Sequence, residues 1–369
     1  MNMHSNRLLV FLFVTLAGVL VLVSCEQATP RFYTAGDFGK VPKTDVHFHY
    51  NTTDLYYLDL AAGINLRFIS PNVDSRVDID EQMNITREIR KLRPDQFAFF
   101  GTFSVDSFAA EDFAERTIAR IDECMKAGAC GIKIWKNIGM VLLDEQGNYV
   151  MADHPKFEPV FRYLEEKKIP VMGHLGEPRN CWLPLEQMTD TSNYRYYKAN
   201  PQYHMYLHPE APSYDDQITA MENLLRKHPG LDYIGAHLAS MEWNVDEVAK
   251  RLDMFPNMSI DISARVQHMQ YQSIENIDRV KNFLLKYQDR IMYGSDVGVT
   301  PRDTVYESRV AQLMERWTSN WIYLATDSVQ KIRNIASPVQ GLKLPADVVD
   351  KIFHTNADRF FQPHDMNAR

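Results

Sequence analysis

The sequence predicts an α/β protein that folds as a (β/α)8 barrel. Eight short runs of β-type residues alternate with longer amphipathic stretches between residues 44 and 296. Alternation sustained over this length indicates a parallel sheet, and eight strands separated by helices close into a barrel. The alternative, an open doubly wound sheet, would carry a glycine-rich loop after one strand, and none of the eight runs is followed by one.

The predicted elements follow from hydrophobic periodicity and from turn residues. The eight runs expected as strands are residues 44–49, 63–70, 97–103, 131–135, 169–174, 231–237, 258–262 and 290–296. Apolar residues recur at helical spacing in residues 81–92, 109–127, 154–168, 215–228, 245–251 and 274–287. Residues 304–363 add further helix, which we expect on the outside of the barrel.

The N-terminal segment has the features of a secretion signal rather than of the fold. Arg7 precedes an almost wholly apolar stretch, and Leu22-Val23-Ser24-Cys25 resembles a bacterial lipobox. We expect residues 1–24 to be a lipoprotein signal peptide and Cys25 to be acylated; an uncleaved anchor helix is the alternative. Glu26 follows the cysteine, which favours the outer membrane facing the periplasm. Residues 25–43 would then be a tether, and residues 44–363 the barrel domain.

Composition and cysteine usage exclude several classes of protein. The chain has 369 residues and a formal net charge of -8, so nothing indicates a nucleic-acid partner. Beyond Cys25 only Cys124, Cys130 and Cys181 remain, an odd number without a CxxC element. We expect buried thiols rather than a disulfide framework.

One connection is far longer than barrel loops usually are. About 55 residues separate the fifth and sixth predicted strands, and residues 176–212 within them are rich in Tyr, Trp and His. A long loop after a barrel strand lies over the active-site face. We expect a lid or a pocket wall there; an aromatic interface in a homodimer is the alternative.

Histidines and an aspartate mark the ends of several predicted strands. His47 and His49 are two apart on the first strand, so both imidazoles face the same way. The fifth, sixth and eighth strands end at His174, His237 and Asp296. The carboxyl ends of barrel strands form the catalytic face, and burying these groups together is costly unless they pair or bind a metal. The pattern predicts a metal site.

The same residues resemble the metal-dependent amidohydrolase superfamily. Within it, Gly-Ala-His-Leu at 235–238, Tyr-Gly-Ser-Asp at 293–296 and the terminal stretch 352–360 are similar to the amidohydrolase-related branch that includes aminocarboxymuconate-semialdehyde decarboxylase. The resemblance covers about residues 44–363, and it implies a TIM barrel.

The resemblance also implies roles for the site residues. His47, His49, His174 and Asp296 would hold one divalent metal, most often zinc, and this donor set also suits Mn²⁺ or Fe²⁺. Such a metal lowers the pKa of a bound water toward about 7. Asp296 would then move the proton to the leaving group, while His237 would stabilise an oxyanion or act as acid or base.

Four further polar residues are less certain members of the site. Lys133 on the fourth strand has three possible roles: a carbamylated bridge to a second metal, a contact to a substrate carboxylate, or a structural ion pair. Arg67 and Arg265 are candidates for holding an anionic substrate, with rim salt bridges as the alternative. Asp261 would orient a neighbour of the metal.

The expected function is hydrolysis of a small-molecule amide, ester or lactone through metal-activated water. Non-oxidative decarboxylation at the same site is the close alternative, and a non-catalytic ligand-binding lipoprotein is the alternative from a different class. Substrate specificity would reside in the loops, chiefly residues 176–212.

Overall fold

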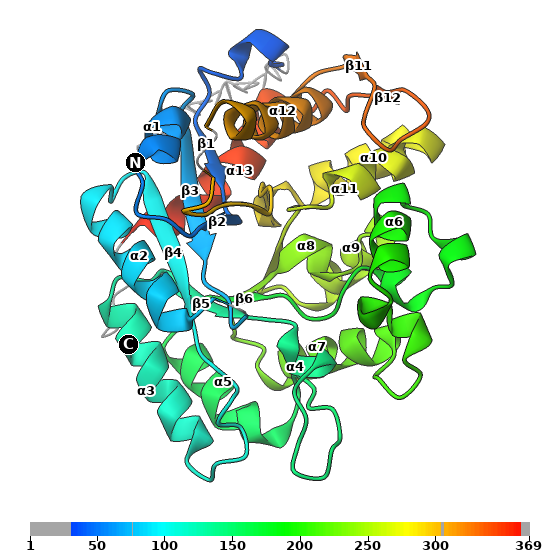
Figure 1. The fold of residues 1–369 in the computed structure, drawn as a ribbon. Coiled ribbons are helices and arrows are strands. Elements are labelled where there is room, and N and C mark those ends of the chain that lie inside the picture. Colours follow the sequence, from blue (N-terminus) through cyan, green and yellow to red (C-terminus); the bar gives the residue numbers. More distant parts are fainter. Residues whose placement is uncertain (1–30, 76, 304–305, 363–369) are drawn as a thin grey trace, which may run out of the picture. The chain divides into compact units, whose positions relative to one another are not determined.

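The computed structural model describes residues 31–75, 77–303 and 306–362, and these form a barrel of eight parallel strands (Figure 1). The strands neighbour one another in chain order, and every pair is parallel. They are β1 (Lys43–Asp45), β3 (Leu66–Pro71), β4 (Phe97–Thr102), β5 (Gly131–Ile134), β6 (Val171–Gly173), β7 (Tyr233–Gly235), β8 (Met258–Asp261) and β9 (Ile291–Met292). The predicted (β/α)8 fold is confirmed.

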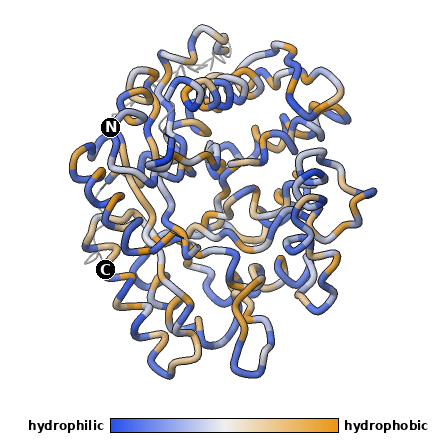
Figure 2. The backbone as a smooth tube through the Cα atoms, in the orientation of Figure 1, coloured by the Kyte–Doolittle hydropathy of each residue, from blue (hydrophilic) through white to orange (hydrophobic). Residues whose placement is uncertain are grey.

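Each strand is followed by a helix, which completes the eight repeats. In chain order these helices are α1 (Tyr56–Ala62), α2 (Ile79–Leu92), α3 (Phe113–Lys126), α5 (Glu158–Glu166), α7 (Tyr214–Lys227), α9 (Val245–Met254), α11 (Ile277–Lys286) and α13 (Ala346–Phe353). Their stop and start signals are local: Asp78 caps α2, and Ser213 forms a capping box with Asp216 at α7. Figure 2 shows polar and apolar residues alternating along the outer helices, as amphipathic packing requires.

The barrel encloses an apolar plug at the amino ends of its strands. One buried cluster draws side chains from most strands and from the C-terminal 3-10 helix η8 (Thr355–Phe361); it comprises Val46, Ile69, Ala98, Phe100, Cys130, Met172, Ile234, Ala236, Met292, Ala357 and Phe360. Gly131 lets the Phe100 ring approach, since a β-carbon there would lie 2.4 Å from the ring. Because this end is sealed, a site inside the barrel opens only at the carboxyl end.

The first predicted strand is broken in the structure. Residues 44–49 read as one run, but β1 ends at Asp45 and β2 (Phe48–Tyr50) pairs instead with β10 (Val297–Val299). Hydrogen bonds from the amide of Val46 to Tyr293 O (3.0 Å) and from the amide of Asp296 to His47 O (2.8 Å) close the barrel across this break.

Several elements were not predicted from the sequence. These are α1, α10 (Val266–Glu275), the antiparallel pair β11 (Val329–Gln330) and β12 (Val339–Gln340), and the short helices α4 (Asn137–Met140) and α8 (Ala236–Ala239). The long connection holds α6 (Thr191–Ala199) and four 3-10 turns, η3 (Arg179–Trp182), η4 (Leu185–Gln187), η5 (Pro201–Tyr203) and η6 (Met205–Leu207). Three further 3-10 turns are η1 (Ala35–Asp37), η2 (Pro155–Phe157) and η7 (Gln288–Arg290).

One of the C-terminal helices packs against the seam of the barrel, where the segment after β1 meets the segment after β9. Helix α13 contacts β1 and β9, and the amide of Tyr293 donates to Ile352 O (2.8 Å). The long helix α12 (Tyr306–Ala325) reaches the same region through Trp317, whose Nε1–H donates to the Asp45 carboxylate (3.1 Å). Within the described ranges, no helix combines the length and apolar character that crossing a bilayer requires.

Residues 31–43, which the sequence analysis assigned to a tether, pack against the barrel domain. Tyr33, Phe38 and Val41 are buried, and Tyr33 donates a hydrogen bond to Asp350 on α13 (2.8 Å). Three spaced apolar residues are enough to dock this segment although its neighbours are polar. Cys25 and the expected signal peptide lie outside the described residues, while Cys124, Cys130 and Cys181 are free and buried as predicted.

The buried carboxylate of Asp45 holds the two sides of the seam together through hydrogen bonds. It accepts from the amides of Ser295 (2.9 Å) and His47 (3.2 Å) as well as from Trp317. We expect Asp45→Ala to lower the free energy of unfolding by about 3–5 kcal/mol, because three buried donors lose their acceptor. Urea denaturation measures this. The control Asp59→Ala removes an exposed ion pair with Arg93 and should cost less than about 1 kcal/mol; equal losses would contradict the assignment.

Candidate metal centre

Four histidines and an aspartate meet at the carboxyl end of the barrel. The ring centroids of His47 and His49 lie 5.2 Å apart, those of His47 and His237 4.6 Å apart, and those of His174 and His237 4.3 Å apart. Asp296 Oδ1 lies 3.3 Å from His49 Nε2 and 3.7 Å from His47 Nε2. Residues that are up to 249 positions apart in the sequence therefore converge, as the strand-end pattern predicted.

Backbone pairing alone brings His47, His49 and Asp296 close to one another. In the β2–β10 pair, Val297 is opposite Phe48 and Gly298 is opposite His49. Asp296 therefore enters the ladder directly beside the two histidines, and its amide bonds to His47 O. Asp296 itself has a left-handed backbone (φ 55°), which turns the chain between β9 and β10.

His237 is held by an unusual stretch of backbone. Residues His237 to Ser240 all have positive φ, between 51° and 59°, although none is glycine. Each such residue costs about 1–2 kcal/mol relative to the right-handed form. The turn is held by Asp261, which accepts from the amide of His237 (2.8 Å), by Tyr214, whose hydroxyl donates to Ser240 O (2.8 Å), and by the Ser240 hydroxyl, which donates to Leu175 O (2.8 Å).

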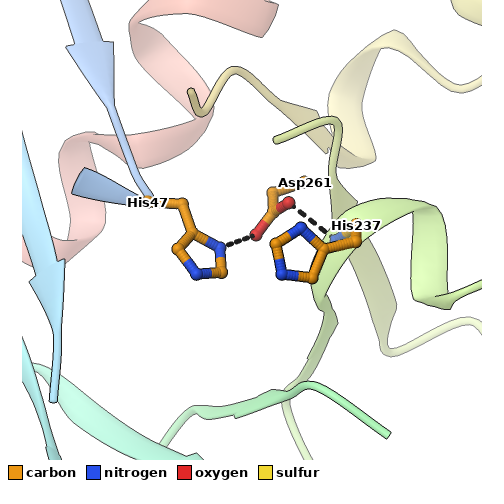
Figure 3. A group of neighbouring side chains, drawn as sticks. All are labelled: His47, His237 and Asp261. Atoms are coloured by element: carbon orange, nitrogen blue, oxygen red, sulfur yellow. Dashed lines mark hydrogen bonds and ion pairs between the residues drawn. The ribbon is translucent and has the colours of Figure 1, made fainter. Parts of the chain in front are cut away.

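Asp261, the last residue of β8, links the histidines of two other strands (Figure 3). Its Oδ2 accepts from Nδ1–H of His47 (2.9 Å), and its Oδ1 accepts from the amides of His237 (2.8 Å) and Ser263 (3.0 Å). The side chain is fully buried, yet its pKa is held below the ordinary value: burial opposes the charge, and His47 with its hydrogen bond outweighs it. Asp261 is an ionised positioning residue, as its place on the strand indicated.

The hydrogen bonds fix which ring nitrogens are free. His47 gives its Nδ1–H to Asp261, and His237 gives its Nδ1–H to Ser263 O (3.0 Å). Burial lowers the pKa of both imidazoles, so both are neutral. Their Nε2 lone pairs are therefore available to a cation or a proton.

His174 has a buried ring nitrogen without a hydrogen-bond partner among the described residues, as a metal ligand would in the absence of its ion. Its ring is buried, burial lowers its pKa well below the ordinary value, and no described residue hydrogen-bonds its Nε2. An orphaned polar atom in a protein interior is costly. The His174 ring centroid lies 4.3 Å from that of His237, but among the described residues no group of possible ligand atoms within 4.8 Å of one another includes His174, so its place among the ligands stays a prediction. The atoms of His47, His49 and Asp296 that would bind an ion all lie within 4.8 Å of one another. The residues present thus fit a divalent metal.

Lys133 lies inside the barrel beneath the imidazoles. Its neighbours Ile132 and Ile134 face the surrounding helices, which leaves Lys133 on the inner face of β5. It is fully buried, burial lowers its pKa to about 8, and no described residue accepts a hydrogen bond from its Nζ. The expected alternative of a structural ion pair finds no partner, while the bridge and the substrate contact both stay open.

Arg67 is placed at the opposite end of the barrel, which corrects its expected role as a substrate contact. It is the second residue of β3, not a residue near its end. Its guanidinium pairs with Asp358 (2.6 Å), donates to Thr44 Oγ1 and stacks on Phe361. These contacts fasten η8 over the apolar plug, so Arg67 is a structural residue.

A cavity lies between the loop after β5 and the long connection, and no residue of the candidate centre is among those that line it. Its volume is about 720 Å³, and Trp135, Lys136, Glu177, Tyr196 and Tyr203 are among the residues that line it. Lys136 forms an ion pair with Glu177. The expectation that residues 176–212 supply a pocket wall agrees with this lining, whereas their role as a lid stays a prediction.

The positioning role of Asp261 can be tested by Asp261→Asn. An amide facing His47 Nδ1 offers a donor where a carboxylate accepted, so His47 must place its proton on Nε2 and lose that lone pair. We expect Zn²⁺ affinity, measured by competition with a chromogenic chelator, to fall by about 10–100-fold with the far-UV spectrum unchanged. Asp253→Asn, on the surface beside Lys286, is the matched control. An unchanged affinity in Asp261→Asn would contradict the role.

The likeness to solved structures is broad and distant. An amidohydrolase II structure is 15% identical, covers 86% of this chain and 99% of its own, and has a TM-score of 0.47. A 5-carboxyvanillate decarboxylase from Novosphingobium aromaticivorans is 15% identical (88% and 98% covered, TM-score 0.41), and a dihydroorotase from Campylobacter jejuni 14% (82% and 93%, TM-score 0.39). These values do not identify a reaction.

The family, in contrast, is shown by the sequence itself. No curated protein matches the chain. The sequence profile of the Amidohydrolase family, however, matches residues 44–362, which is nearly the whole barrel. That family uses a divalent metal, in agreement with the donor set at the barrel mouth. The chain belongs to the amidohydrolase family.

Proposed function

We propose that the chain is a metal-dependent hydrolase that cleaves a small-molecule amide, ester or lactone. The observation that carries this proposal is the convergence of three neutral, buried imidazoles with His49 and Asp296 at the open end of the barrel. A purely structural cluster would pair its polar atoms, whereas His174 Nε2 and Lys133 Nζ have no partner among the described residues.

His47, His49, His174 and Asp296 would hold the cation. When bound, a divalent metal polarises a carbonyl group and makes water more acidic. The amidohydrolase resemblance points to zinc, and the donor set of imidazoles and one carboxylate is consistent with it. A second ion would require Lys133 to be carbamylated, and its pKa of about 8 leaves part of the amine neutral for that reaction at neutral pH.

Asp296 is placed to move the proton of the attacking water. Its side chain is 31% exposed, more than any of the neighbouring histidines, so solvent and substrate reach it. A carboxylate there accepts a proton as water attacks the carbonyl carbon and returns it to the leaving nitrogen or oxygen. The proton thus stays within one group, which suits hydrolysis of either an amide or an ester.

His237 is best suited to accept rather than donate. Its Nδ1–H is committed to Ser263 O, and burial disfavours a second proton on the ring. In the resting state Nε2 therefore carries a lone pair toward the centre, where it receives a proton or binds a cation. Stabilising an oxyanion, the other role expected from the sequence, would require the ring to be protonated first.

The metal requirement gives the most direct test. We expect purified protein to hold at least one divalent ion per chain, and chelation to abolish hydrolysis of 4-nitrophenyl esters, lactones or N-acyl amino acids until metal is returned. His47→Ala and Asp296→Ala should each lower kcat by about 1000-fold or more while the barrel stays folded. His154→Gln, which changes a histidine outside the centre, should keep full activity. Full activity in either site variant would refute the proposal.

Product analysis separates hydrolysis from decarboxylation at the same centre. Hydrolysis in H₂¹⁸O places the label in the acid product, because water supplies the oxygen that replaces the leaving group. Release of CO₂ from a substrate without incorporation of the label would assign a decarboxylase instead. Absence of bound metal after supplementation would favour the non-catalytic binding role.

A further inference from the structure

Arg265 lies close to the candidate metal centre and forms no ion pair with any residue that the structure describes. It follows β8 by four residues and lies two residues after Ser263. The hydroxyl of Ser263 is 3.1 Å from His47 Nδ1 and 3.0 Å from His237 Nδ1. Ala264, with φ 54°, turns the chain sharply at this point. The charge of Arg265 is felt at both His174 and His237, where it helps to lower their pKa.

The guanidinium of Arg265 is incompletely bonded. Its Nε is buried and has no hydrogen-bond partner among the described residues, where the one hydrogen bond of the guanidinium runs from Nη1 to the adjacent Ala264 O (3.3 Å). Other shielded arginines are paired: Arg251, 13% exposed, contacts Glu222 and Glu247. Among residues 31–75, 77–303 and 306–362, no carboxylate forms an ion pair with Arg265. A shielded charge without a partner is unfavourable, and an arriving anion would relieve it.

The two nearby carboxylates do not fill this place. Asp190, on the long connection, accepts from the amide of Asn193 (2.7 Å) and from Gln267 Nε2 (3.1 Å). Glu242 accepts from the amide of Arg179 (2.9 Å), and burial raises its pKa to about 7 despite the opposing charge of Arg265. Glu242 is therefore protonated in part at neutral pH and offsets only a fraction of the arginine charge.

Lys133 is a second buried cation without an ion pair among the described residues, but its surroundings differ. It is fully buried, and the charges of Asp261 and Asp296 both act on it. Arg265 lies instead where α10 meets the long connection, through the bond between Gln267 and Asp190. A ligand that contacts both Arg265 and the imidazoles would have to span the segment from Ser263 to Arg265, because the Ser263 hydroxyl lies beside two of the rings.

We propose that Arg265 binds an anionic group of the substrate, and that the substrate class is a carboxylate-bearing amide, ester or lactone. A single guanidinium matches the single charge and the planar shape of a carboxylate, which it binds through two parallel hydrogen bonds. This inference rests on the proposed function, since it assigns the substrate of the same centre. Its test does not depend on turnover.

Binding of matched pairs tests the inference. Acetate, succinate and benzoate are each compared with the corresponding amide by isothermal titration calorimetry at pH 7, with metal present and after chelation. We expect at least one carboxylate to bind tenfold or more tightly than its amide. Arg265→Gln should reduce that preference to within twofold, and Arg265→Lys should keep part of it. The control Arg162→Gln, at an exposed pair with Glu158 on α5, should leave it intact.

A stability measurement excludes a merely structural role. Because Arg265→Gln removes an unpaired charge, its melting temperature should equal or exceed that of the parent chain. Arg251→Gln, which breaks two ion pairs, should melt lower. The inference is overturned if no carboxylate is preferred, if Arg265→Gln keeps the preference, or if it melts as low as Arg251→Gln. If the protein binds no metal but still prefers carboxylates through Arg265, the proposed hydrolase function is refuted and the inference about Arg265 stands.

Discussion

The break in the first strand is the constraint on which the centre depends. After Asp45 the chain leaves the eight-stranded sheet and pairs, as β2, with β10. That short ladder, together with the bond from the Asp296 amide to His47 O, sets the positions of His47, His49 and Asp296 through backbone geometry alone. These side chains are therefore arranged before any ligand arrives, which is what precise chemistry at a rim requires. The buried carboxylate of Asp45 anchors the same seam from beneath, so the stability of the barrel and the shape of the centre share one set of contacts.

Asp261 performs the corresponding task for the other side of the centre. Its oxygens bind His47 from the first strand and the backbone of His237 from the left-handed turn. Four consecutive residues in that conformation are unfavourable for side chains with a β-carbon, and the turn persists because Asp261, Tyr214 and Ser240 hold it at both ends. The strain aims the His237 ring at His47 and His174, whose centroids lie within 5 Å of it. One buried carboxylate thus sets the tautomer of His47 and, with Tyr214 and Ser240, holds the turn that carries His237.

Sequence patterns predicted the repeats and the converging strand ends because both depend on periodicity. The two-residue spacing of His47 and His49 and the terminal positions of His174, His237 and Asp296 follow from parity along a strand. The break after Asp45 left no signal, since Val46 and His47 continue the β-type run. The left-handed turn could not be predicted either, because residues 237–240 contain no glycine that would indicate it. Arg67 was misjudged for a different reason: β3 begins at residue 66 rather than 63, so a residue expected near the end of the strand is the second residue of the real one. Boundaries of this kind are set by tertiary pairing and not by local composition.

The distribution of charge along the barrel axis connects the fold to the kind of ligand it admits. The amino end is filled by apolar side chains and by the Arg67–Asp358 pair, whereas the unpartnered Nε2 of His174 belongs to the centre. There the charges of Asp261 and Asp296 face those of Lys133 and Arg265, while the buried imidazoles are neutral. These two negative and two positive charges nearly cancel in the protein alone. A divalent cation held by the histidines and Asp296 would shift the balance to a net positive charge in a poorly solvated space, which strengthens attraction for an anion. If the centre holds such an ion and Arg265 binds the substrate anion, as we propose, metal binding and recognition of the substrate would be coupled by electrostatics.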